Sequence, residues 1–366
     1  MFHTILTLSY TIPGIYLFFR IWSLFIPKKH LWSYLPVFAM MYSVYPLSQS
    51  LEDSMNPVSI LLGNISNYLL PFFLYLFLLL LITDIFLLIN RISGVLNKNL
   101  IRRIVYTYRY FSILTALSIL IVVAGIINFN TIRSTTYHLK IPAGGSNIDN
   151  LRVAFVSDFH LERSVSGKFV QRFVKKISSI KPDILLYGGD IVEGNGDNLG
   201  DFELMLRSIR TRYGVYGALG NHDRISNFRD NFFTRSGIVL LRDSTVMINN
   251  AFMLAGRKLG RNSREDASEI VSGSTYLPVI LLDHIPTDFN NISSTKTDLV
   301  FSGHTHAGQL FPINLYLKHV YELSHGHMQK GNTHFIVSSG IRLWGPRVRT
   351  VGKSEIVVAE IEFVQN

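Results

Sequence analysis

The stretch VAFVSDFH, from Val153 to His160, places an aspartate and a histidine directly after an apolar run. A short apolar run of this kind predicts a buried β-strand, so both polar side chains fall in the turn that follows it. Taken alone, Asp158 is an ordinary turn or helix-capping residue and His160 an ordinary rim residue. A functional reading requires that other strands end in the same way.

Four further apolar runs end in side chains of the same kind. ILLYGGD ends in Asp190, YGALGNHD in Asn221, His222 and Asp223, VILLDHIP contains His284 at the strand end, and LVFSGHTH ends in His304 and His306. Open α/β sheets place their active sites at the carboxyl ends of their strands. The set contains the oxygen and nitrogen ligands of two adjacent divalent ions, and it therefore predicts a dimetal site.

The amino-acid composition indicates that part of the chain lies in a membrane. Of the 366 residues, 48% are hydrophobic and only 16% are charged, whereas about a quarter of the residues of a soluble protein are charged. The length allows about two domains. The sequence has no cysteine, which excludes disulfides, thiolate zinc sites and cysteine nucleophiles. Any metal must be held by imidazole, carboxylate, amide or water.

The net charge of +10 does not indicate a nucleic-acid partner. A nucleic-acid-binding domain carries its basic residues as a patch on a folded surface. Here many cations flank or connect hydrophobic segments, where membrane orientation explains them better. These cations are Lys28, Lys29, Arg91, Lys98, Arg102, Arg103 and Arg109.

Residues 1–130 are expected to form an all-α transmembrane region of about four helices. The segments Tyr68 to Ile89 and Phe111 to Phe129 are apolar over about the 20 residues that a helix needs to cross a bilayer. Two weaker segments start at Ile5 and Leu31 and are interrupted by Pro13, Arg20 and Pro36. The opening MFHT lacks the positive region of a secretory signal, so the first segment is expected to be a retained anchor.

The distribution of cations between these segments predicts their orientation. The loops after the first and third segments are basic, whereas the loop after the second contains Glu52 and Asp53 and no lysine or arginine. With four spans, the positive-inside rule places both termini outside the cytoplasm. An odd number of spans would reverse the side of the C-terminal domain. Membrane lipids are the expected partners.

Asp84 lies inside the third segment, where a carboxylate is costly and often functional. Because it is close to the end of the segment, we expect it to reach the membrane interface. A role in moving a proton or a substrate is the alternative.

From residue 131 to residue 150 the chain turns polar, and IPAGGSNIDN predicts a linker. Beyond it, over residues 151–366, short apolar runs alternate with helical patterns such as GKFVQRFVKKISSI. This alternation predicts an α/β domain.

The blocks DFH, GGD, GNHD, DHIP and GHTHAGQ resemble the ordered motifs of the calcineurin-like metallophosphoesterases. The stretches SDFHLE, GHTHAGQLFP and VSSGIRLWGPRVR are most similar to the membrane-associated branch of YkuE and YaeI type phosphodiesterases, although Phe159 stands where that branch more often has leucine. The resemblance implies two facing β-sheets flanked by helices, with the metals at the loop edge.

The resemblance also implies a role for each residue. One ion would be held by Asp158, His160, Asp190 and His306, and the other by Asp190, Asn221, His284 and His304, so that Asp190 bridges. Mn²⁺, Fe²⁺ or Zn²⁺ suits this set. A metal-bound hydroxide would attack phosphorus, His222 would act as general acid or stabilise transition-state charge, and Asp223 would orient its ring.

Three arginines, Arg342, Arg347 and Arg349, form a basic stretch in GIRLWGPRVR. They would grip a substrate phosphate, face anionic lipid headgroups, or form a solvated surface. The histidines of SHGHMQ, His325 and His327, lie outside the motif blocks and are expected in a surface loop.

The expected protein is therefore an integral protein of a bacterial inner or plasma membrane that carries an extracytoplasmic dimetal phosphohydrolase domain. Its activity would be that of a phosphodiesterase, phosphomonoesterase or pyrophosphatase. A lipid-linked substrate resembling UDP-diacylglucosamine fits the branch, but a nucleotide-sugar lipid made in the cytoplasm would not meet an extracytoplasmic site. The alternative is a catalytically silent, metal-bound binding or sensor module on a membrane anchor.

Overall fold

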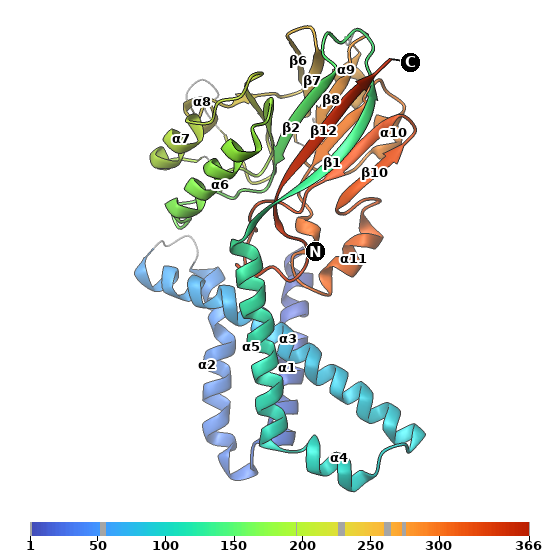
Figure 1. The fold of residues 1–366 in the computed structure, drawn as a ribbon. Coiled ribbons are helices and arrows are strands. Elements are labelled where there is room, and N and C mark those ends of the chain that lie inside the picture. The colour runs from blue at the N-terminus through green and yellow to red at the C-terminus, as the bar shows by residue number, and fades with distance from the viewer. Residues whose placement is uncertain are drawn as a thin grey trace. The chain divides into compact units, whose positions relative to one another are not determined.

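The computed structural model describes residues 2–51, 56–194, 196–225, 231–259, 265–272 and 276–365. The chain forms two compact units, one comprising Met1–Ile127 with Gly345–Thr350 and the other Asn128–Trp344 with Val351–Asn366. Figure 1 traces the chain through both.

The first unit is helical, and its elements follow one another with short connections. They are α1 (Phe2–Phe25), the 3₁₀ turn η1 (Lys28–His30), α2 (Leu31–Ser50), α3 (Pro57–Ser93), α4 (Lys98–Ile104) and α5 (Tyr108–Asn130). Local chemistry sets the ends of α3: the Asn56 side chain accepts a hydrogen bond from the Ser59 amide, and Gly94 ends the helix in the left-handed conformation.

Within the described residues, two helices are long and apolar enough to cross a membrane: α3, with an 18-residue window of mean hydropathy 2.8, and α5, with a window of 2.5. Helix α3 has 37 residues, roughly 55 Å of helix, which exceeds the hydrocarbon core of about 30 Å. The segments at Ile5 and Leu31 are helical, as expected. The count of four spans, and the orientation that depends on it, stay predictions.

Asp84 has partners inside the helical unit. It forms an ion pair with Arg20 of α1 and accepts a hydrogen bond of 2.7 Å from the Tyr16 hydroxyl. The charged side chains are 23% and 26% exposed. The carboxylate therefore joins α1 to α3. Its position at the membrane interface stays a prediction.

The second unit contains two six-stranded mixed sheets. The order of the first is β1-β12-β2-β3-β4-β5, and that of the second is β10-β11-β9-β8-β7-β6. The first sheet comprises β1 (Ile132–Pro142), β12 (Ser354–Val364), β2 (Asn150–Val156), β3 (Ile184–Gly188), β4 (Val215–Ala218) and β5 (Val239–Leu240). The second comprises β10 (Gly326–Lys330), β11 (Thr333–Val337), β9 (Leu299–Ser302), β8 (Val279–Leu282), β7 (Phe252–Gly256) and β6 (Ser244–Ile248). The expected α/β architecture is confirmed.

The two sheets face each other across one apolar core. Phe155 of β2 and Phe301 of β9 stack with ring centroids 4.7 Å apart, and Leu186 of β3 and Leu282 of β8 belong to the same buried cluster. Alternate residues of β2 point the other way. Ala154 and Val156 pack in a second cluster with the apolar face of α6 (Gly167–Ile180).

Short helices complete the layers. The first sheet has α7 (Gly200–Arg207) and α8 (Phe232–Arg235) near α6 (Figure 1). Helices α9 (Ala267–Val271) and α10 (Phe289–Ser293) contribute apolar side chains to a third cluster with β7, β8 and β9. Helix α11 (Ile313–Val320) follows the GHTH segment.

The expected linker over residues 131–150 is largely a strand. Strand β1 pairs in parallel with β12 along its whole length, from Ile132 opposite Ser354 to Pro142 opposite Val364 (Figure 1). It is an edge strand with many exposed polar side chains, so its local pattern resembles that of a linker. The second domain therefore begins at β1, and only the turn after Pro142 keeps the expected irregular character.

Candidate metal centre

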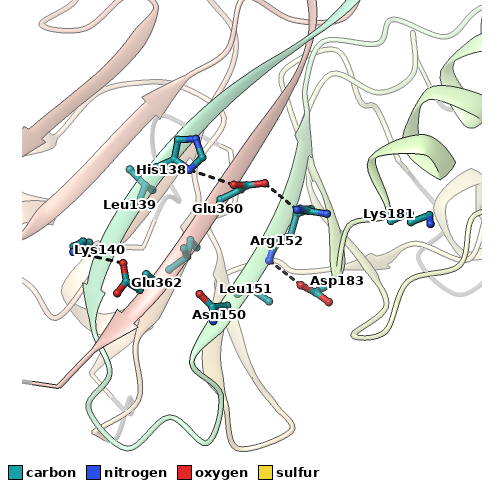
Figure 2. Close-up of a pocket in the computed structure, with 11 residues that line it drawn as sticks. His138, Leu139, Lys140, Asn150, Leu151, Arg152, Lys181, Asp183, Glu360 and Glu362 are labelled. Carbon is teal, nitrogen blue, oxygen red and sulfur yellow. Dashed lines mark hydrogen bonds and ion pairs between the residues drawn. The ribbon is translucent and has the colours of Figure 1, made fainter.

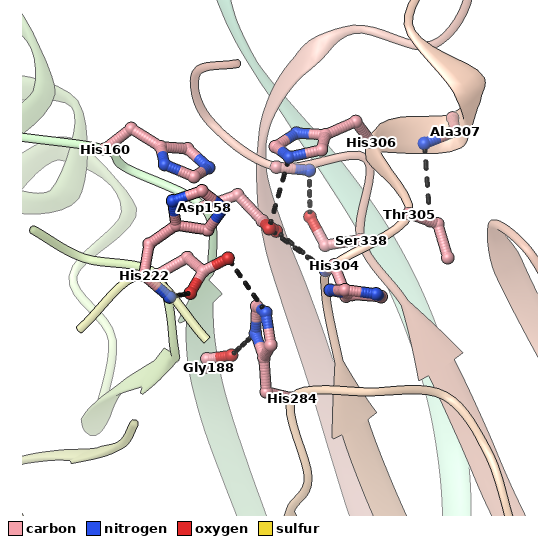
Figure 3. A network of polar contacts seen from close by, with 12 residues as sticks. Asp158, His160, Gly188, His222, His284, His304, Thr305, His306, Ala307 and Ser338 are labelled. Atoms are coloured by element: carbon pink, nitrogen blue, oxygen red, sulfur yellow. Dashed lines mark hydrogen bonds and ion pairs between the residues drawn. The ribbon is translucent and has the colours of Figure 1, made fainter. Parts of the chain in front are cut away.

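The carboxyl ends of five strands carry the predicted site residues, and the structure brings six of these residues into two groups. The ligand atoms of Asp158, His160 and His306 lie within 4.8 Å of one another, and so do those of Asp190, His284 and His304. Figure 3 shows the rings of His160 and His306 beside Asp158, and His284 between Gly188 and the carboxylate group. Parallel pairing of β2 with β3 and of β8 with β9 explains why these side chains meet.

The backbone at these positions is unusual. Five predicted ligands have a positive φ: Asp158 (55°), His160 (47°), Asp190 (53°), His304 (72°) and His306 (51°). Such angles are uncommon for residues other than glycine and cluster at functional sites. The chain therefore turns sharply after β2, β3 and β9, which aims the side chains back across the sheet edge.

Asp158 is fully buried and is fixed by the GHTH segment. The amide of His304 donates to Oδ1 of Asp158 over 3.0 Å. A Cβ atom on Gly303 would lie 2.4 Å from Oδ2 of Asp158, so only glycine allows this approach. Burial favours the neutral acid, but the charges of His306 and His284 outweigh it and lower the pKa of Asp158.

His284 uses both ring nitrogens. Nδ1 donates to the carbonyl oxygen of Gly188 over 2.7 Å, and Nε2 lies 3.1 Å from Oδ2 of Asp190. Burial lowers the pKa of His284, but the Asp190 carboxylate more than compensates and raises it to about 10. With Nδ1 committed to a backbone carbonyl, Nε2 is the nitrogen available to a metal.

The surroundings of His160 and His304 show whether the site suits a metal ion. The Nε2 atom of His160 is buried and has no hydrogen-bond partner within the described part of the chain, although an orphaned buried nitrogen is costly. Burial and the neighbouring His284 lower the pKa of His304 to about 4, so its ring is neutral at pH 7 and has a lone pair to donate. Neutral imidazoles beside carboxylates are the ligand set of Mn²⁺, Fe²⁺ and Zn²⁺, and the residues present fit such ions.

His222 lies beside both groups and contacts Asp190 through its backbone, its amide donating to Oδ1 over 2.7 Å. Its Nδ1 atom lies 3.0 Å from Oε2 of Glu193. Burial lowers the pKa of His222, but the hydrogen bond with Glu193 and the charge of Asp190 outweigh burial and raise it. A histidine whose pKa is raised holds its proton more tightly, which suits it to act as an acid.

Asp223 does not orient His222. Its carboxylate accepts hydrogen bonds from three backbone amides, those of Ile191, Val192 and Gly220, at 2.8 to 2.9 Å. Both oxygens are thus used to hold the turns after β3 and β4 together. The expected contact with the His222 ring is made by Glu193 instead. Burial and the nearby Asp190 raise the pKa of Asp223 to about 7.

The sequence matches the family described as Calcineurin-like phosphoesterase over residues 151–308. An uncharacterized metallophosphoesterase of Aquifex aeolicus is 30% identical over 234 residues, which cover 61% of this chain and 88% of the relative. This chain belongs to the calcineurin-like metallophosphoesterase family.

Two further relatives have different coverage. Uncharacterized metallophosphoesterase Cj0846 of Campylobacter jejuni is 29% identical over 300 residues, or 78% of each chain. That share is more than the second unit alone can supply, so the similarity extends into the helical unit. The UDP-2,3-diacylglucosamine pyrophosphatase LpxG of Chlamydia trachomatis is 23% identical over 234 residues, which cover 50% of this chain and 71% of the relative.

Asn221 lies exposed in the turn between Gly220 and His222 of the metallophosphoesterase domain. Its assignment as an amide ligand stays a prediction. The turn itself lies close to the metal centre. A Cβ atom on Gly220 would lie 2.1 Å from Oδ1 of Asp190.

Arg342 is buried, and its guanidinium lies over the rings of Phe129 and Phe169, 5.1 Å from each centroid. This stacking argues against its expected role in gripping substrate. Arg347 and Arg349 belong to the segment Gly345–Thr350, which is part of the helical unit, where Arg349 is fully buried and its amide donates to Gly125. A substrate role for Arg347 stays a prediction, and a solvated surface role for Arg349 is wrong.

His325 and His327 do not lie in a simple surface loop. Nε2 of His325 lies 3.0 Å from Oε1 of the buried Glu355, and Nε2 of His327 lies 3.0 Å from Nδ1 of His334. Burial favours neutral Glu355, but the hydrogen bond and charge of His325 outweigh this and lower the pKa of Glu355 to about 2. Glu355 lies on β12, 30 residues after His325, which the local pattern cannot reveal, whereas His334 lies on β11, the strand that directly follows the β10 strand of His327.

A separate cavity of about 510 Å³ lies over β1, β12 and β2, and none of the predicted metal ligands lines it. Its basic side chains are largely paired: Arg152 and His138 contact Glu360 at 3.0 and 3.2 Å, and Lys140 lies 3.5 Å from Glu362 (Figure 2). The paired charges give this cavity little attraction for a charged ligand.

Glu193 is the site residue that sequence reasoning missed. It follows Asp190 by three positions in GGDIVEG, and its carboxylate contacts both His160 and His222. The only signal in the sequence was an acidic residue in the loop after a predicted ligand.

Proposed function

We propose that this protein is a membrane-anchored metallophosphoesterase that hydrolyses phosphoesters with two divalent ions. The observation that carries the proposal is the pair of facing ligand groups, one built on Asp158 and the other on Asp190. The Nε2 atom of His160 supports it, because this atom is buried without a hydrogen-bond partner among the described residues and a metal ion would satisfy it.

One ion would be held by Asp158, His160, Asp190 and His306, and the other by Asp190, Asn221, His284 and His304. The surroundings of Asp190 support its role as a bridge between the two ions. Its Oδ1 accepts a hydrogen bond from the His222 amide, and its Oδ2 lies beside the ring of His284. When bound, the two ions neutralise charge on the phosphoryl group and lower the pKa of water.

His222 would donate a proton to the leaving-group oxygen. Its Nδ1 is engaged by Glu193, so Nε2 is the atom left to face a substrate. The raised pKa of His222 means that the ring holds this proton more tightly than an unperturbed imidazole does. The indole of Trp344, which is 46% exposed, lies 5.8 Å from the His222 ring and would border the leaving group.

For the substrate, we favour a lipid-linked phosphodiester or pyrophosphate over a soluble phosphomonoester. The two apolar helices and the similarity to a pyrophosphatase named for a lipid substrate support this choice. The same two observations support the assignment of this protein to the membrane-associated branch of YkuE and YaeI type phosphodiesterases. Mn²⁺ is the ion to test first.

Hydrolysis of bis-p-nitrophenyl phosphate by the full-length protein in detergent, with added Mn²⁺, tests the proposal. We expect turnover by the wild type, a loss of at least about 100-fold in Asp190→Asn, and no change in Asp201→Asn, an exposed aspartate on α7. Equal inactivity of wild type and Asp190→Asn across Mn²⁺, Fe²⁺ and Zn²⁺ would favour the alternative, a metal-bound sensor or binding module.

We further propose that the catalytic domain is extracytoplasmic in a bacterial inner or plasma membrane. The chain has no cysteine, so a single cysteine introduced at an exposed site such as Lys181 reports the side directly. Labelling of Lys181→Cys by a membrane-impermeant maleimide in intact spheroplasts is expected. Labelling only after lysis would place the domain in the cytoplasm and remove the objection to a nucleotide-sugar lipid substrate.

A further inference from the structure

Exposed apolar side chains gather on α11 and on the segment that leads into it. Within the described residues of the second unit, ten large apolar side chains are exposed, and five of them lie between residues 311 and 320. These five are Phe311, Ile313, Leu315, Tyr316 and Val320. Apolar side chains that are exposed singly are normal, whereas a cluster of them marks a binding surface.

Helix α11 turns one face toward the protein and another away from it. Asn314 and Leu317, three residues apart, are half-buried, whereas Ile313, Tyr316 and Val320 are exposed. The spacing of three and four residues places these three side chains on one face of the helix. No residue of α11 is fully buried. Figure 1 shows this helix outside the layers of the two sheets.

We propose that this face of α11, formed by Ile313, Tyr316 and Val320, docks on the surface of the lipid bilayer. The proposal rests on the membrane anchor of the function proposed above, and it does not depend on hydrolysis. The last turn of the helix carries the exposed cations Lys318 and His319. An apolar face with an aromatic ring and neighbouring basic side chains is typical of a helix that lies in the membrane interface and meets anionic headgroups.

The connection to the anchor favours a bilayer over a soluble partner. Helix α5 has 23 residues, which is roughly 35 Å of helix and little more than the hydrocarbon core of about 30 Å. Only Thr131 separates α5 from β1, so the second unit is held close to the headgroups. An apolar face tethered by so short a connection meets lipid at a much higher effective concentration than any soluble protein.

Docking of α11 would determine the depth of the metal centre relative to the headgroups, because the helix is joined to the GHTH segment. The ring of Tyr321, the residue after α11, lies 6.4 Å from the ring of His304. The Thr305 hydroxyl donates to the carbonyl oxygen of Ser324 over 2.6 Å. A docked helix would therefore hold the centre at the level where the phosphate of a lipid-linked phosphodiester lies.

Single nitroxide labels can locate this face, because the chain has no cysteine of its own. Tyr316→Cys reports on α11, and Leu204→Cys on α7 is the matched control, since both side chains are 69% exposed. Ile82→Cys on α3, where the side chain is 61% exposed, reports on the anchor. Each full-length variant is reconstituted in nanodiscs of phosphatidylcholine and phosphatidylglycerol. Electron paramagnetic resonance measures label mobility and collisions with oxygen, which partitions into lipid, and with a water-soluble nickel chelate.

We expect oxygen to reach the label at position 316 more readily than the chelate does, at a depth of about 5 to 10 Å in the boundary between headgroups and acyl chains. The label at position 82 should show the same preference, and the label at position 204 the reverse.

Two results at position 316 would overturn docking and leave the anchor intact, provided that the label at position 82 lies in lipid. The first is a preference for the chelate equal to that at position 204. The second is an immobilised label that neither reagent reaches, because another part of the chain or a second copy would then cover the face. An aqueous label at position 82 would overturn the anchor and, with it, the docking.

A second pair of variants tests whether docking serves the metal centre. Tyr316→Glu places a charge on the docked face, and Leu204→Glu places one on α7. The substrates are phosphatidyl-p-nitrophenol in the nanodisc and bis-p-nitrophenyl phosphate in water. We expect the ratio of kcat/KM for the lipid substrate to that for the soluble one to fall about tenfold in Tyr316→Glu, since an apolar contact is lost. The ratio should not change in Leu204→Glu.

An unchanged ratio in Tyr316→Glu would overturn the link between docking and the metal centre. If the wild type hydrolyses neither substrate, the proposed function fails. The three nitroxide labels then still decide whether α11 lies on the bilayer.

Discussion

Nε2 of His284 lies 3.1 Å from Oδ2 of Asp190, at the position where both residues would face the same ion. The contact raises the pKa of His284 to about 10 in spite of burial. Without a metal, the ring therefore keeps at pH 7 the proton that the ion must replace.

Metal binding should consequently release protons. A ligand imidazole must be neutral, so the proton on His284 leaves when the ion enters, and affinity rises with pH by up to about tenfold per unit below pH 10. Calorimetric titration with Mn²⁺ in two buffers of different ionisation enthalpy, between pH 6 and pH 8, measures the number released. Identical apparent enthalpies in both buffers would contradict the expectation.

Gly303→Ala should disturb the centre without removing a ligand. The new methyl group would lie 2.4 Å from Oδ2 of Asp158 and 2.5 Å from Oγ of Ser157, and a forced contact in a packed interior costs about 1 to 3 kcal/mol. We expect a lower melting temperature and Mn²⁺ affinity reduced at least tenfold. Gly200→Ala is the control, since nothing lies within 4 Å of the added atom there. Equal behaviour of the two variants would show that the centre tolerates the methyl group.

The positions of the ligands were predictable from the sequence because each one follows an apolar strand. Asp158, Asp190 and His304 follow β2, β3 and β9, and parallel pairing brings such positions to one edge. The apolar runs predicted an α/β domain, whereas the division of its strands into two facing sheets was expected only from the resemblance to the family.

Other features depend on contacts between distant segments, which local patterns do not encode. Strand β1 is recognisable only through its pairing with β12, more than 200 residues later. Asp223 is adjacent to His222 in sequence, but its carboxylate is occupied by the amides of Ile191 and Val192 from another loop. Glu193 lies in the loop beyond the strand-end aspartate rather than at the strand end, so only its place in that loop distinguished it from a solvated acid.

Ionisation of Asp298 should lower the free energy of unfolding as the pH rises. Burial raises its pKa to about 6, although its carboxylate accepts a hydrogen bond from the amide of Val279. The native state therefore binds the proton more tightly than the unfolded state, and stability falls between about pH 4 and pH 6 by at most about 3 kcal/mol.

Asp298→Asn should remove this slope, because asparagine keeps the acceptor and has no charge. Melting temperatures of the two proteins in detergent, from pH 4 to pH 7, give the comparison. Parallel curves for variant and wild type would mean that Asp298 titrates normally.

Breaking the ion pair between Arg20 and Asp84 should destabilise the helical unit. Asp84→Asn leaves Arg20 beside the apolar helices without its counter-ion, and we expect a cost of about 1 to 3 kcal/mol. The double variant Arg20→Met with Asp84→Leu should lose less, because no charge is left unpaired. Melting temperatures in a single detergent measure both. A double variant less stable than Asp84→Asn would show that the pair itself is strongly favourable.

The left-handed backbone at five ligand positions determines which substitutions report on chemistry. Alanine at Asp158 or His306 would remove a ligand and also place a residue that disfavours positive φ into a conformation with φ near 50°. Asparagine adopts this conformation more readily than alanine. An alanine scan of the sheet edge would therefore mix lost coordination with altered loop geometry, whereas asparagine replacements would separate the two effects.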